Sequence, residues 1–161
     1  MARRPRPEQI EFTVTAPDDV VAAIEGLVAA RAGWVNLFPE VDEAEAAAVT
    51  PSAVGAIFRA PGPPIPQATL MAPTDGRRGP KPAQLGMTHG VGTAVVRRLA
   101  AEGLTLPEGW KVVQDHVRRG LVIRLDDPPD VDRVLTWALR AGTLLCPIAT
   151  TGGWLAEVHP R

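Results

Sequence analysis

A short segment, residues 87–92, combines residue types that could hold an anion. It reads Met-Thr-His-Gly-Val-Gly and lies between a predicted strand and a predicted helix. Glycines at such a junction let the backbone approach a ligand, and free amides at a helix start attract negative charge. His89 could donate to a phosphate or carboxylate, and Arg97 follows in the helix. The sequence thus predicts a ligand site of His89, Gly90, Gly92 and Arg97, although a tight turn with a hydrogen-bonded histidine explains the same residues.

Other catalytic signatures are absent from the sequence. Val95 stands where a dinucleotide-binding motif would need its third glycine, and there is no phosphate-binding loop, nucleophile elbow or HExxH zinc motif. Three histidines, one cysteine and no tyrosine leave few groups for metal, acid–base or nucleophilic chemistry. We therefore assign no catalytic residue, expect no metal and no cofactor, and favour a non-enzymatic role.

Two further polar positions have plain structural explanations. Asp115 and His116 are neighbours at a predicted hairpin, and neighbours on a strand point to opposite faces, so their adjacency does not make a catalytic dyad. Cys146 lies in the apolar run 144–148 and is interpreted as a small core residue.

Composition is that of an ordinary globular protein, with 45% hydrophobic residues, 22% charged residues and a formal net charge of −1. The single cysteine cannot form an internal disulfide, and neither a signal peptide nor an apolar stretch of membrane-spanning length is visible. These observations predict a soluble cytoplasmic protein without membrane contact. Basic residues gather at 3–6 and 77–81 and could neutralise phosphates, but no aromatic residue interleaves with them.

Three segments are predicted to be helices, at residues 17–31, 91–102 and 129–141, with Gly33, Gly103 and Gly142 ending them. The runs with strand character are residues 10–15, 34–38, 55–59, 68–72, 84–88, 110–115, 121–125 and 154–158. Residues 116–120 are predicted to be a hairpin turn with its glycine at the tip, and the acidic stretch from Glu40 is predicted to begin a short exposed helix.

This order predicts an α+β protein in which an antiparallel sheet carries its helices on one face. Residues 83–161 follow a ferredoxin-like β-α-β-β-α-β order. Residues 1–72 form a β-α-β-β part that is either a degenerate copy of the same unit or an extension of the same sheet. Between them, the Pro/Gly/Arg-rich residues 73–82 are predicted to be an irregular, exposed loop that proteases cut first, although we expect one continuous core.

The same dipeptide follows each predicted helix: Gly33-Trp34, Gly109-Trp110 and Gly153-Trp154. Glycine permits the reversal out of a helix, and tryptophan can cover the open end of a helix–sheet seam. We therefore predict three structural tryptophans rather than three ligand-binding ones, with Trp110 and Trp154 mostly buried.

Three functional hypotheses follow. The favoured one is a cytoplasmic binding or protein-interaction module, because a sheet with helices on one face leaves the other free for a protein partner or a second copy of the chain in a homodimer. The second is a small enzyme or sensor that holds an anionic small molecule at residues 88–92. The third, and least favoured, is an accessory nucleic-acid-binding protein that uses its basic segments.

Overall fold

The computed structural model describes residues 6–49 and 63–160. The strand predicted at 55–59 and most of the basic segment 3–6 lie outside the described residues. Within them four helices and nine strands follow one another as β1 (Glu8–Thr13), α1 (Asp18–Ala30), β2 (Trp34–Val41), α2 (Glu43–Val49), β3 (Gln67–Met71), β4 (Thr74–Gly76), β5 (Gly79–Lys81), β6 (Gln84–Thr88), α4 (Val95–Ala101), β7 (Lys111–His116), β8 (Gly120–Arg124), α5 (Val131–Leu145) and β9 (Thr150–His159).

Seven strands form one antiparallel sheet in the order β1-β9-β2-β3-β6-β8-β7. The α+β class with an antiparallel sheet is therefore confirmed. The C-terminal strand β9 lies between β1 and β2, so the two halves of the chain share one sheet. Elements β6 to β9 keep their expected sequence order, but β2 and β3 separate β9 from β6. The ferredoxin-like arrangement and the degenerate repeat consequently stay predictions.

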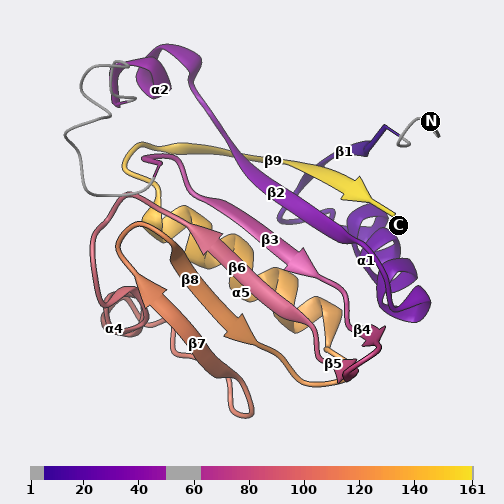
Figure 1. Cartoon of the computed structure of the whole chain (residues 1–161). Helices are drawn as coiled ribbons and strands as arrows, with labels where there is room; N and C mark the ends of the chain where they lie inside the picture. The colour runs from indigo at the N-terminus through magenta and orange to yellow at the C-terminus, as the bar shows by residue number, and fades with distance from the viewer. Residues whose placement is uncertain (1–5, 50–62, 161) are drawn as a thin grey trace.

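One face of the sheet packs against helices to form the core. In Figure 1, α5 runs behind the sheet, across β2, β3 and β6, and α1 lies beside it. Alternate residues of each central strand point into this layer. In β2, for example, Val35 and Leu37 are at most 1% exposed, whereas their neighbours are half-buried. The buried side chains of both helices and of the sheet join in one hydrophobic cluster.

The second predicted helix is shorter than expected. The helix α4 begins at Val95 rather than near residue 91. Gly92 and Ala94 have φ values of +95° and +57°, in the left-handed region, and this backbone course keeps residues 91–94 out of the helix. The first helix agrees with its prediction to within one residue at each end.

The prediction that Gly142 ends the third helix is wrong. The helix α5 continues through this residue to Leu145. Gly142 is buried against the indole of Trp154, and a Cβ at this position would lie 2.6 Å from the Cη2 atom of that ring. The glycine therefore makes room for an aromatic side chain. Trp110 and Trp154 are 7% and 2% exposed, as predicted.

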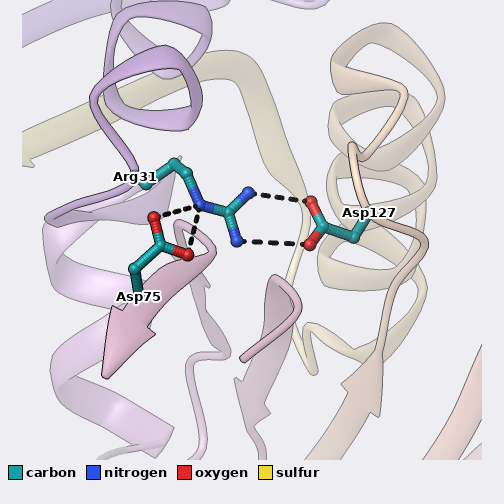
Figure 2. A network of polar contacts seen from close by, with 3 residues as sticks. All are labelled: Arg31, Asp75 and Asp127. Atoms are coloured by element: carbon teal, nitrogen blue, oxygen red, sulfur yellow. Dashed lines mark hydrogen bonds and ion pairs between the residues drawn. The ribbon is translucent and has the colours of Figure 1, made fainter. Parts of the chain in front are cut away.

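The stretch 73–82 is not irregular, which corrects the prediction of a structureless loop. Its strands β4 and β5 pair as a small hairpin. Arg31, which ends α1 in a left-handed conformation, connects this hairpin to the segment before α5 (Figure 2). Its Nε donates to both carboxylate oxygens of Asp75 at 2.9 Å, and its Nη1 and Nη2 donate to Asp127 at 3.2 and 3.3 Å. One arginine thus bridges three segments that are distant in sequence.

Candidate functional site

The predicted ligand turn follows β6 and places His89 inside the protein. This side chain is 1% exposed, and neither of its ring nitrogens has a hydrogen-bond partner among the described residues. Burial lowers the pKa of His89 from its ordinary value; the nearby Asp115 carboxylate opposes that shift and the Arg98 guanidinium adds to it. His89 is therefore a buried, neutral imidazole on the helix side of the sheet.

The helix begins after the predicted turn, and the amides at its observed start already bind an anionic group of the chain itself. Asp115 lies on β7, and its carboxylate oxygens accept from the backbone N–H groups of Val95 and Val96, each at 3.3 Å. This carboxylate neutralises the positive end of α4. An external anion would have to displace Asp115 or lie beside its negative charge. The electrostatics at the start of this helix therefore disfavour an anionic ligand.

The four predicted ligand residues lie in different environments. Gly90 and Gly92 are half-buried in the turn, and His89 is buried beneath it, whereas Arg97 is exposed on α4. Within the described residues, Arg97 makes no hydrogen bond or ion pair to the turn. The neighbouring Arg98 does contact it, because its Nη1 donates to the carbonyl oxygen of Val91 at 2.8 Å. Sequence reasoning missed this contact because it expected Val91 to be part of the helix, whereas α4 begins only at Val95.

The hairpin residues have structural roles. Asp115 points to the helix side, and the Nδ1 atom of its neighbour His116 accepts from the backbone N–H groups of Arg118 and Arg119 at 3.1 and 3.3 Å. The two side chains therefore accept hydrogen bonds from different segments, as expected for neighbours on a strand. Cys146 is half-buried at the end of α5.

The face of the sheet opposite α1 and α5, here called the open face, carries a mixed apolar and polar surface. It points toward the viewer in Figure 1, and no described helix crosses it. In β2 its residues are Trp34, Asn36 and Phe38, all half-buried. Trp34 therefore does not cover a helix–sheet seam, which corrects the prediction that all three tryptophans do so. The signal was present in the sequence, because Trp34 and Phe38 belong to the outward-facing set of β2 while Val35 and Leu37 belong to the inward-facing set.

Cross-strand pairing extends the apolar area over neighbouring strands. Leu155 of β9 pairs with Phe38, and Met71 of β3 pairs with Trp34. Met71 is 44% exposed, so its side chain stands at the surface. Val122 of β8 lies on the same face farther along the sheet. The result is a band of large apolar side chains over β9, β2 and β3, and β6 separates Val122 from this band.

Polar groups in the middle of the open face bind one another. The Thr69 hydroxyl donates to the Asn36 Oδ1 atom at 2.9 Å, and the Asn36 Nδ2 atom lies 3.5 Å from His159 Nε2. The His159 ring also stacks on Trp34, with ring centroids 4.7 Å apart and planes 9° from parallel. These contacts satisfy part of the hydrogen-bonding capacity of the three side chains, which lowers the cost of covering them with a partner.

Acidic and basic side chains lie on different strands of the open face. Glu11 on β1 and Glu157 on β9 lie toward one edge of the sheet. Arg124 on β8 and Lys111 on β7 lie toward the other edge. The apolar band occupies the space between the two groups, so the open face is negative on one side and positive on the other.

A glycine in a central strand leaves a shallow place on this face. Gly86 lies in β6 between Thr69 of β3 and Val122 of β8. Its backbone does not need glycine, because its φ is not positive and a Cβ would meet nothing closer than 3.8 Å. Glycine inside a strand weakens the strand, and it often marks a place where another molecule approaches closely.

Two of the clefts elsewhere on the described surface have volumes of several hundred Å³. One, of about 400 Å³, separates α5 from the segment before β7 and has both acidic and basic side chains at its rim, among them Asp132, Arg133 and Arg140. The other, of about 520 Å³, lies where β1, β2 and β9 end and contains Glu40, whose Oε2 accepts from the Thr151 hydroxyl at 3.0 Å. Neither cleft presents a buried polar atom without a partner. Both are therefore weaker candidates than the open face.

Comparison with known proteins gives no match to a family model, to a curated protein or to a solved structure. The described residues contain no group of three or more side chains that could hold a metal ion. None of the helices in this part of the chain is long and apolar enough to cross a membrane. The functional argument consequently rests on the geometry of the chain itself.

Proposed function

We propose that this chain is a protein-interaction module that binds another polypeptide through the open face of its sheet. The observation that carries the proposal is the band of half-buried apolar side chains around Trp34, Phe38 and Leu155, which no described helix covers. Sheets of this kind bury one face and commonly expose a polar one. A large apolar band on the exposed face therefore indicates a contact surface.

The composition of the open face suits a protein partner. Tryptophan, phenylalanine and methionine are enriched at the centres of protein interfaces, where they provide most of the buried area. Here Trp34 and Phe38 occupy the central region, and charged side chains lie nearer the edges. The acidic Glu11 and Glu157 on the same face argue against nucleic acid as the partner.

The alternative of an anion-binding enzyme or sensor at residues 88–92 has less support. The buried, unpartnered imidazole of His89 is its best feature. However, the Asp115 carboxylate already occupies the amides at the start of α4. The interaction module therefore stands as the preferred function.

A matched pair of charge insertions tests this proposal. Met71 on the open face and Leu144 on α5 have similar exposure, 44% and 40%, so each can become glutamate with little effect on folding. We expect Met71→Glu to abolish stable association with polypeptide partners in affinity purification from the native host, and we expect Leu144→Glu to retain it. Thermal unfolding of both variants controls for misfolding. Retention of the same partners by a folded Met71→Glu variant would contradict the proposal.

A further inference from the structure

The buried imidazole of His89 lies outside the proposed interaction surface and has no role in it. This side chain is 1% exposed, and neither ring nitrogen has a hydrogen-bond partner in the described part of the chain. Most buried polar groups in proteins are paired, because an unpaired donor or acceptor lowers stability. Histidine is also the side chain whose ordinary pKa lies between pH 5 and pH 8. An unpaired imidazole at this position can therefore change its charge near neutral pH and affect whatever surrounds it.

The helix that follows this histidine is held at its start by a carboxylate from another strand. The helix α4 has seven residues, and its buried side chains are those of Val95 and Leu99. A helix this short has little stability of its own. The N–H groups of Val95 and Val96 donate to Asp115 on β7, each over 3.3 Å, which is long for a hydrogen bond to a charged acceptor. The start of α4 thus depends on a weak contact with one carboxylate.

Two charged side chains hold this turn and also act on the ring. Besides Asp115 at the helix start, Arg98 on α4 contacts the turn, because its Nη1 donates to the carbonyl oxygen of Val91 at 2.8 Å. Burial lowers the pKa of His89 most; the Asp115 carboxylate raises this pKa, and the Arg98 guanidinium lowers it further. The contacts that close the turn and the charge of the imidazole are therefore coupled.

A proton on His89 changes the balance of these contacts. A buried cation without a partner is costly, so the imidazolium needs an anion or water. Of the described acidic side chains, Asp115 is the one that acts on the ring, and with the ring neutral the two make no hydrogen bond. An ion pair between them requires the carboxylate to turn away from the α4 amides. Repulsion between the imidazolium and the Arg98 guanidinium also favours opening of the turn.

We propose that His89 is an acid-sensitive switch: when its ring takes up a proton, the Asp115 carboxylate exchanges the two α4 amides for the imidazolium, and residues 89–96 open. At neutral pH the ring is uncharged, and Asp115 caps the helix. The open form binds the proton more readily than the closed form, so its population rises as the pH falls below 6.5. The switch acts within one chain and is independent of the open face.

Amide hydrogen exchange measures this opening residue by residue. Between pH 7 and pH 5 the protection factors of Val95 and Val96 should fall by up to roughly 25-fold, which is the limit for an open form with the ordinary histidine pKa of about 6.5. The amide of Leu139, within α5, should be better protected than both at each pH, because the opening is local. Equal protection in the two helices would mean that only global unfolding exposes His89, and it would overturn the switch.

Two matched histidine variants assign the response to one ring. In His89→Leu, the protection of Val95 and Val96 should no longer depend on pH. His116→Asn is the control, because it removes the nearest histidine in sequence to Asp115, and the asparagine Oδ1 can replace the Nδ1 acceptor of the hairpin amides. The response should persist in this variant. A response that survives in His89→Leu, or that disappears in His116→Asn, overturns the assignment to His89.

The variant Asp115→Asn tests the partner of the imidazolium. Asparagine keeps an oxygen acceptor for the α4 amides but carries no charge. We expect the midpoint of the His89 titration, followed by the ¹⁵N chemical shifts of its ring, to move to lower pH, and the loss of protection at Val95 to move with it. An unchanged midpoint would show that the carboxylate does not receive the imidazolium, and it would overturn the proposed exchange.

Discussion

The two faces of the seven-stranded sheet are formed by alternating residues of the same strands, yet their side chains differ in polarity and in burial. Toward α1 and α5 the side chains are almost entirely aliphatic or aromatic and buried. On the open face, apolar side chains such as Phe38 and Leu155 share the surface with Asn36, Thr69 and charged residues nearer the edges. The first face resembles the interior of a domain, and the second resembles the centre and rim of an interface.

The difference teaches that apolar character alone does not identify a core residue. In β2, Leu37 and Phe38 are neighbours and both are apolar, but only Leu37 meets the helices. What separates them is the direction of the side chain, which alternates along a strand. The two faces should therefore respond differently to the same substitution.

The largest expected effect compares these two neighbours. Leu37→Ala removes a side chain that is 1% exposed and leaves a cavity, so we expect a loss of about 2–5 kcal/mol in the free energy of unfolding. Phe38→Ala removes a half-buried side chain, and we expect a loss of only about 1 kcal/mol. Urea unfolding of both variants measures the difference. Equal losses would show that the open face is as closely packed as the core in the isolated chain.

A smaller effect tests the packing of α5 on the core side. In Gly142→Ala the new methyl group must displace the buried Trp154 ring, so overpacking of about 1–3 kcal/mol should exceed the gain of about 1 kcal/mol in helix propensity. Gly26→Ala in α1 is the matched control, because a Cβ there meets nothing within 4 Å. We expect the melting temperature to fall in the first variant and to rise in the second. A rise of the melting temperature in both variants would mean that the Trp154 ring moves aside at little cost in free energy.

The smallest effect is a pH dependence that originates at His89. Because burial lowers its pKa, the folded protein binds a proton there less readily than the unfolded chain does. The unfolding free energy should therefore be unaffected by this group well above its ordinary pKa of 6.5, and it should decrease as the pH falls below that value, by at most about 1.4 kcal/mol per pH unit. Once the pH is below the folded-state pKa, the decrease from this group stops.

The variant His89→Leu isolates this contribution, since it fills the same buried position with an apolar side chain of similar size and removes the titrating group. Denaturant unfolding between pH 7 and pH 5 should show a shallower pH dependence for His89→Leu than for the wild type. Parallel curves would mean that the imidazole gains a partner or water in solution and does not remain a buried neutral group.

Much of the fold could be predicted because local signals agreed with one another. The helix at residues 17–31 has an acidic first turn, an apolar stripe and a glycine after it, and all of these persist in α1. The strands at 84–88 and 121–125 were also predicted within one residue. The hairpin at 74–81 was missed because its stretch is rich in proline and glycine, and its contact with Arg31, 44 residues away from Asp75 in sequence, leaves no local signal.

The candidate site was harder to predict. The turn at 88–92 has the glycines of an anion site, and only the position of Asp115 shows that the helix amides are already occupied. The open face gave a sequence signal in the two-sided apolar pattern of β2, but that pattern also fits a strand buried on both faces. Which interpretation holds depends on where α1 and α5 pack.

By itself the sequence determined the α+β class, the main helices and strands, and the burial of Trp110 and Trp154, because these follow from periodicity and from large apolar side chains. Only the tertiary structure decided that β9 lies between β1 and β2, that Gly142 accommodates Trp154, and that Trp34 lies on the open face. The physical reason is that strand order and the packing of helices on one face arise from contacts between residues far apart in the chain. No local pattern encodes such contacts.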